Sequence, residues 1–177
     1  MTGQAFIALL PELISTGFLI LVLMAGVFSD SNAGVAAGLA ALGTLAVFGS
    51  AAFLLATGFS GSYFGGGFVV DGFALYFKLI VAGSAFFAVL AAARWSGQTG
   101  DAPEYLTLIL SVVLGSTLLV SMRDLFGIFL AIELATIPSY AMVAFDRSRR
   151  ESAEGGMKYL ITGVIASSVL LLSLIHI

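Results

Sequence analysis

Residues 124–145 read DLFGIFLAIELATIPSYAMVAF, an apolar stretch with a single acidic residue, Glu133, in its interior. A helix that crosses the hydrocarbon core of a membrane needs about 20 mostly apolar residues, and this stretch is long enough. Other stretches of similar length and composition cover residues 8–28, 33–57, 68–93, 104–122 and 157–175. The sequence therefore predicts an all-α, polytopic transmembrane protein with about six helices.

The composition of the whole chain supports this class. Hydrophobic residues make up 60% of the sequence and charged residues only 10%, against roughly 25% charged residues in soluble domains. The few basic side chains form no patch that could neutralise nucleic-acid phosphates, so we expect no nucleic-acid partner. The chain has no cysteine and one histidine, His176. We therefore expect no disulfide, no iron–sulfur cluster, no metal site and no redox cofactor in this chain.

The segments between the predicted helices indicate an orientation. They cover residues 29–32, 58–67, 96–103 and 146–154. Basic residues gather around the last of them and at the end of the third helix, namely Arg94, Arg147, Arg149, Arg150 and Lys158. Short cytoplasmic loops carry an excess of Lys and Arg. The pattern places residues 146–154 in the cytoplasm and the N-terminus outside, with Arg123 and Asp124 as an anchor pair at the outer membrane face.

Glu133 is the first candidate for a functional residue. It lies nine residues into its predicted helix and so about 13 Å deep, at 1.5 Å per residue. A central acidic side chain costs about 2.5 to 3.5 kcal/mol on insertion scales, and such residues commonly mark proton or ion pathways. We interpret Glu133 as a proton-translocating carboxylate. The alternative is a neutral, hydrogen-bonded packing residue.

Lys78 is the second candidate, about ten residues into the third predicted helix. It lies on nearly the same helix face as Asp71, two turns away. Lys78 is expected to join an internal polar track or to pair with an acid on another helix, although a lysine can also extend its side chain to the membrane surface. Glu12 follows Pro11 at the predicted start of the first helix and is expected at the interface.

Several motifs, taken in order, resemble one membrane-protein family. They are Leu10–Leu13 (LPEL), Asp71–Lys78 (DGFALYFK), Glu133-Leu134 with Pro138–Tyr140 (PSY), Glu154–Leu160 (EGGMKYL) and Ala166–Ser168. Together they resemble subunit N of proton-translocating NADH:quinone oxidoreductase, the respiratory complex I. The resemblance implies an antiporter-like fold of about fourteen helices built from inverted repeats. It also implies a bacterial inner membrane protein in which proton pumping is coupled to quinone reduction.

The same resemblance implies roles for individual residues and partners. Glu133 matches the family's glutamate on the fifth helix, whose partner lysine on the seventh helix has no counterpart in these 177 residues. Partner subunits of the membrane arm are expected to surround the chain in the lipid bilayer, and other subunits are expected to handle NADH and quinone. Alternatives are a subunit of a multisubunit cation/proton antiporter or of a membrane-bound hydrogenase, and a structural membrane scaffold.

The chain divides into two parts on this interpretation. Residues 1–171 correspond to the first six transmembrane helices of such a subunit. Residues 172–177 read LSLIHI, a hexapeptide that is expected to derive from a sequencing adapter. His176 would then carry no function.

Overall fold

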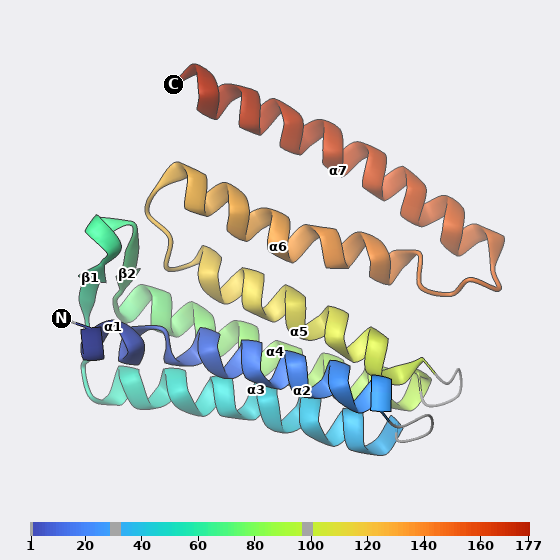
Figure 1. The fold of residues 1–177 in the computed structure, drawn as a ribbon, viewed down its shortest axis with the longest axis horizontal. Helices are drawn as coiled ribbons and strands as arrows, with labels where there is room; N and C mark the ends of the chain where they lie inside the picture. Colours follow the sequence, from blue (N-terminus) through green and yellow to red (C-terminus); the bar gives the residue numbers. More distant parts are fainter. Residues whose placement is uncertain (1, 29–32, 97–100) are drawn as a thin grey trace.

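The computed structural model describes residues 2–28, 33–96 and 101–177, and this part of the chain is mostly helical (Figure 1). The helices are α1 (Thr2–Ala8), α2 (Leu10–Phe28), α3 (Ala33–Ala56), α4 (Gly72–Ser96), α5 (Ala102–Leu119), α6 (Leu125–Val143) and α7 (Arg150–His176). Among the described residues, α2 to α7 are each long and apolar enough to cross a membrane. The predicted all-α transmembrane architecture with six spans is confirmed.

Helices α2 to α5 form a four-helix body. Each packs against two neighbours in the ring α2, α3, α4, α5, and α3 also contacts α5 across one diagonal. The centre of the body holds small and branched side chains, among them Val22, Ala36, Val89 and Leu106, one from each helix. Such residues let the helices approach closely, which is how membrane helices associate.

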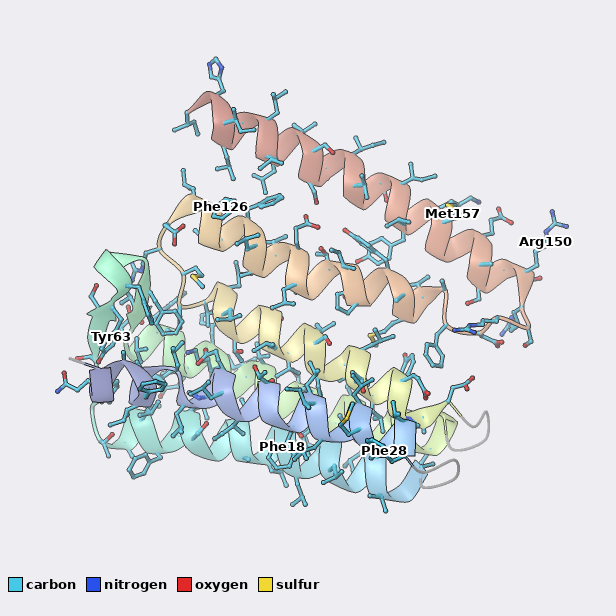
Figure 2. All side chains as sticks on the ribbon, viewed as in Figure 1. Phe18, Phe28, Tyr63, Phe126, Arg150 and Met157 are labelled. Atoms are coloured by element: carbon cyan, nitrogen blue, oxygen red, sulfur yellow. The ribbon has the colours of Figure 1, made fainter. Side chains whose placement is uncertain are left out.

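Helices α6 and α7 lie progressively farther from this body. Helix α6 packs on α5, and α7 packs on α6 (Figure 1). Gly156 is the only buried residue of α7, and Met157 is 58% exposed on the side of α7 that faces away from α6 (Figure 2). The long apolar surface of α7 suits lipid or other membrane helices and would be costly in water.

A short β-hairpin joins α3 to α4 at the end of the molecule that holds the N-terminus (Figure 1). Strands β1 (Gly61–Tyr63) and β2 (Phe68–Val70) pair in antiparallel fashion around a 3-10 turn, η1 (Phe64–Gly66). Gly65 and Gly66 have φ values of 68° and 96°, which glycine adopts without strain. The turn at the tip of the hairpin therefore depends on these glycines.

The structure corrects two predicted boundaries. The third long helix begins at Gly72 and not at residue 68, because residues 68–70 form β2. The last helix begins at Arg150 and not at residue 157, so only residues 146–149 separate α6 from α7. Hydropathy detects the apolar part of a helix and misses a polar first turn. The predicted turn at 29–32 lies outside the described residues, as does 97–100 within the predicted turn at 96–103.

Candidate functional site

Lys78 and Glu12 form an ion pair inside the four-helix body. The Nζ atom of Lys78 lies 2.6 Å from Oε1 of Glu12, and the two side chains are 0% and 5% exposed. Lys78 comes from α4 and Glu12 from α2, which face each other across the long diagonal of the body and have little backbone contact. The predicted pairing of Lys78 with an acid on another helix is thus present in the structure, whereas its functional role stays a prediction.

The structure buries the side chain of Glu12 between helices, which its predicted place at the interface did not suggest. Helix α1 precedes α2, and the amide of Leu13 donates to the carbonyl of Leu9, so the helical path begins well before Glu12. Pro11 has no N–H to donate to the carbonyl of Ile7, which accounts for the break between α1 and α2. Glu12 therefore lies inside a longer helical path and points into the body. The apolar residues among 2–8 could have indicated that a helix precedes Pro11 and Glu12.

An aromatic ring and its apolar cluster lie beside the ion pair. The ring of Phe68 lies 5.2 Å from Nζ of Lys78, and Phe68 packs in a cluster with Leu75. Ser15, one helical turn after Glu12, and Ser121, which follows α5, are both fully buried. Neither hydroxyl has a hydrogen-bond partner among the described residues. Buried polar atoms of this kind commonly bind ordered water.

Asp71, Arg123 and Asp124 do not belong to this pair. Oδ1 of Asp71 accepts a hydrogen bond from the amide of Ala74 at 2.8 Å and so caps α4, while Oδ2 lies 3.1 Å from the guanidinium of Arg123. Asp124 caps α6 by accepting from the amide of Gly127 at 2.6 Å. Arg123 thus pairs with Asp71 and Asp124 caps α6, while the role of Arg123 and Asp124 as an anchor pair at the membrane face stays a prediction. Asp71 shares a helix face with Lys78, but Lys78 pairs with Glu12 instead.

Glu133 lies on α6, eight residues after Leu125 and so about 12 Å along the helix. Its side chain is partly buried, and Oε1 is buried with no hydrogen-bond partner among the described residues. The hydroxyl of Thr136, three residues later, is likewise buried and has no hydrogen-bond partner among the described residues. The structure does not join Glu133 to Lys78, whose ammonium group is taken by Glu12.

Helices α5 and α6 approach closely beside Glu133. A Cβ atom on Gly115 would lie 2.5 Å from the backbone nitrogen of Ala135. Helix α6 continues through Pro138, and the hydroxyl of Ser139 donates to the carbonyl of Ala135 at 2.8 Å. The close contact fixes the height of Glu133 against α5, and Pro138 leaves the carbonyl of Leu134 without an amide donor from its own helix.

A cavity of about 730 Å³ opens farther along the same helices. It is lined by residues of α4, α5, α6 and α7, mostly apolar, with hydroxyl groups from Ser84, Ser116, Ser139, Tyr105 and Tyr159. Glu133, Glu12 and Lys78 are not among the lining residues. Glu12, Lys78 and Glu133 are therefore separate from this cavity.

Comparison with known proteins found relatives by sequence and similar folds by structure. Residues 122–177 match the family described as NADH:quinone oxidoreductase/Mrp antiporter, transmembrane. NADH-quinone oxidoreductase subunit N of Rubrobacter xylanophilus is 69% identical over 175 residues, which are 98% of this chain and 36% of that protein. F(420)H(2) dehydrogenase subunit N of Methanosarcina mazei is 30% identical, over 97% of this chain and 36% of that protein.

Solved structures agree with these matches. A chain of respiratory complex I from Thermus thermophilus superposes with a TM-score of 0.74 at 25% identity, covering 89% of this chain and 34% of that one. A chain of the archaeal membrane-bound sulfane sulfur reductase has a TM-score of 0.71 at 21% identity, over 97% and 36% respectively, and shows likeness of fold. The chain spans about a third of the length of the curated relatives it matches.

Proposed function

Because the chain belongs to the subunit N family of NADH-quinone oxidoreductases and spans about a third of such a subunit, we propose that it forms part of a proton-translocating membrane subunit. In this proposal the chain moves protons while redox chemistry takes place in partner subunits of a membrane-arm complex. With no cysteine and one histidine, the chain offers few ligands for a redox centre of its own.

The observation that carries the proposal is the unpartnered carboxyl oxygen of Glu133 in a membrane-spanning helix. A permanently charged carboxylate at this depth would be costly without a cation, and the described residues supply none. A carboxyl group that alternates between charged and neutral forms avoids that permanent cost. Taking up and releasing one proton is what such alternation consists of, so Glu133 is proposed as the proton carrier.

Lys78 is proposed as a second charged residue that takes part in proton translocation. It is fully buried, and the structure gives it an acidic neighbour instead of a path to the membrane surface. This arrangement argues against the alternative in which Lys78 extends its side chain to the membrane surface and has no further role. Buried, paired charges in membrane helices are associated with ion and proton pathways.

We also propose a location and an orientation. The chain would lie in a bacterial inner membrane with the N-terminus and hairpin outside, and residues 146–154 in the cytoplasm. Figure 2 shows Tyr63 of the hairpin and Arg150 at opposite ends of the molecule. The basic residues Arg147, Arg149 and Arg150 therefore share the end opposite the hairpin, which fits the preference of basic residues for the cytoplasmic side.

A second candidate is a subunit of a cation/proton antiporter or of another respiratory membrane complex. Two observations favour it: the matching family description includes the Mrp antiporter, and the archaeal sulfane sulfur reductase shares the fold. The relative named for F(420)H(2) also indicates that different electron donors serve related subunits. Transport that requires sodium in place of a redox donor would favour the antiporter. A pure scaffold predicts assembly defects without transport defects.

The test replaces Glu133 in an intact complex. Residues 1–171 of this chain would replace the matching segment of the Rubrobacter xylanophilus subunit N, and the chimeric complex would be reconstituted in vesicles. Glu133→Gln should lower NADH-driven proton uptake by about tenfold or more, because proton-transfer groups contribute about 10²–10⁴-fold to the steps they serve. A pH-sensitive dye reports the uptake.

Glu151→Gln is the matched control, since Glu151 is exposed in the first turn of α7. It should leave proton uptake unchanged. Normal proton uptake per NADH oxidised in the Glu133→Gln complex would contradict the proposal.

A further inference from the structure

The ion pair of Glu12 and Lys78 spans the interior of the four-helix body. Its two helices are diagonal neighbours, so the side chains reach toward each other through the centre. A surface pair would be screened by water, but these side chains are 5% and 0% exposed. Burying both charges carries a desolvation penalty that offsets much of their attraction. Burial therefore works against the charged form of the pair, while the short contact between the two charges works for it.

The contact is short, yet it leaves hydrogen-bonding capacity unused. The 2.6 Å contact is not aligned as a hydrogen bond, and both oxygens of Glu12 and the nitrogen of Lys78 lack other partners among the described residues. The buried hydroxyls of Ser15 and Ser121 are likewise unpaired. Most of the unpaired buried polar atoms in the described residues thus belong to the Glu12–Lys78 pair and its neighbourhood, and the rest belong to Glu133 and Thr136.

Other charged groups are kept away from the pair. Helix α3 carries no ionisable residue, and the ionisable residues of α5, Glu104 and Tyr105, lie at its opposite end. On the hairpin side, the ionisable residues include Tyr63, which packs on Phe59, and Asp71, which pairs with Arg123. Asp124 also lies there, beside Gly67, and caps α6. Among the described residues, the ion-pair partner of each member of the pair is therefore the other member.

We propose that Glu12 and Lys78 form a second proton-exchange site, separate from Glu133. In the exchange, an N–H bond of the Lys78 ammonium breaks and an O–H bond forms on the Glu12 carboxylate, which leaves a neutral amine and a neutral acid. The reverse transfer restores the ion pair, so charge and atoms balance. Water held by the hydroxyl of Ser121, beside β2, would connect the pair to the hairpin end of the bundle, and water at Ser15 would lie on the other side of Glu12 along α2. The inference rests on the proposed proton-translocating function.

The decisive variant is Lys78→Arg in the chimeric complex. Arginine keeps the positive charge and can pair with Glu12, but it does not release a proton under physiological conditions. We expect the variant complex to assemble and its proton uptake to fall by about tenfold or more. A purely structural ion pair would be preserved by arginine, so an assembled complex with normal uptake would overturn the proposal.

The double variant Glu12→Gln with Lys78→Met serves if arginine is too large for the site. It removes both charges together, so no uncompensated charge is left buried. We expect assembly with low proton uptake; assembly with normal uptake would overturn the proposal. Failure of both variants to assemble would show an obligatory structural pair and would also overturn it. Glu104→Gln, at an exposed residue of α5, is the control that should behave as the parent.

Proton uptake of the Glu133→Gln complex is measured in parallel, to distinguish failure of the proposed function from failure of the Glu12–Lys78 exchange site. If Glu133→Gln pumps normally, the proposed function itself is contradicted. If it loses pumping while the Lys78 and double variants pump normally, only the exchange site is contradicted.

Discussion

Gly115 determines how closely α5 and α6 can approach each other. Its absent side chain leaves room for the backbone of Leu134 and Ala135, directly after Glu133. Close backbone approach at small residues is a common way for membrane helices to pack. The position of the carboxyl group of Glu133 relative to α5 therefore depends on a residue of the neighbouring helix.

Gly115→Ala should destabilise the protein. The added Cβ would lie 2.5 Å from a backbone nitrogen, so α6 would have to move. Overpacking of this kind costs about 1–3 kcal/mol. A lower half-inactivation temperature of the solubilised chimeric complex would record the effect.

Gly38→Ala is the matched control on α3, because nothing lies within 4 Å of a Cβ at that position. Alanine is favoured over glycine in helices by up to about 1 kcal/mol, so this variant should be neutral or slightly more stable. Equal behaviour of the two variants would show that the α5–α6 contact is not tight.

Glu133 and Lys78 illustrate which features of the site could be predicted from the sequence. The depth of Glu133 in a helix followed from the sequence, because apolar length alone determines it. The partner of Lys78 did not follow, because Glu12 is remote in sequence and the two helices meet across a diagonal. Nothing in the spacing of one helix reveals which other helix it faces.

At the scale of elements, the hairpin joins two connections that are far apart in the sequence. The amide of Val69 donates to the carbonyl of Ser121 at 2.8 Å, and the amide of Arg123 donates to the carbonyl of Gly67 at 2.9 Å. The α5–α6 connection thus pairs with β2 like a further strand. The sequence predicted only a glycine-rich turn at 58–67, because three-residue strands are too short to show alternation.

Asp71 allows the contributions of capping and ion pairing to be separated. Asp71→Ala removes the cap of α4 and the pair with Arg123, and should destabilise by about 1 kcal/mol. Asp71→Asn keeps an equally good cap and loses only an exposed ion pair, which is worth about 0–1 kcal/mol. Half-inactivation temperatures of the two variants would be compared. Equal losses would show that the ion pair, and not the cap, holds this end of α4.

At the scale of the whole molecule, the two ends differ in character. One end carries the hairpin and the N-terminus, and the other carries the connection from α6 to α7 with its arginines (Figure 1). Six spans and their order were predictable, since each is read from local hydropathy. The grouping of four helices into a body, with α6 and α7 outside it, was not, since it depends on side chains that meet from different helices.

The proposed orientation can be tested with single cysteines, because the chain has none of its own. Ser62→Cys in the hairpin should react with a membrane-impermeant maleimide added to intact cells. Ser148→Cys, between α6 and α7, should react only after the membrane is permeabilised. Both positions are exposed. The parent chimera serves as the blank, and the reverse labelling pattern would invert the orientation.

The backbone ladder at the hairpin has a mechanical consequence for α6. Sliding of α6 along its axis at its N-terminal end would break the bonds of Val69 and Arg123, which tie its preceding segment to the start of α4. At its C-terminal end, α6 continues into residues 146–149 and then α7, which has little packing of its own. The hairpin end of α6 is thus tied more firmly than its C-terminal end, so any tilt of α6 about the hairpin end would displace its C-terminal end farther than Glu133.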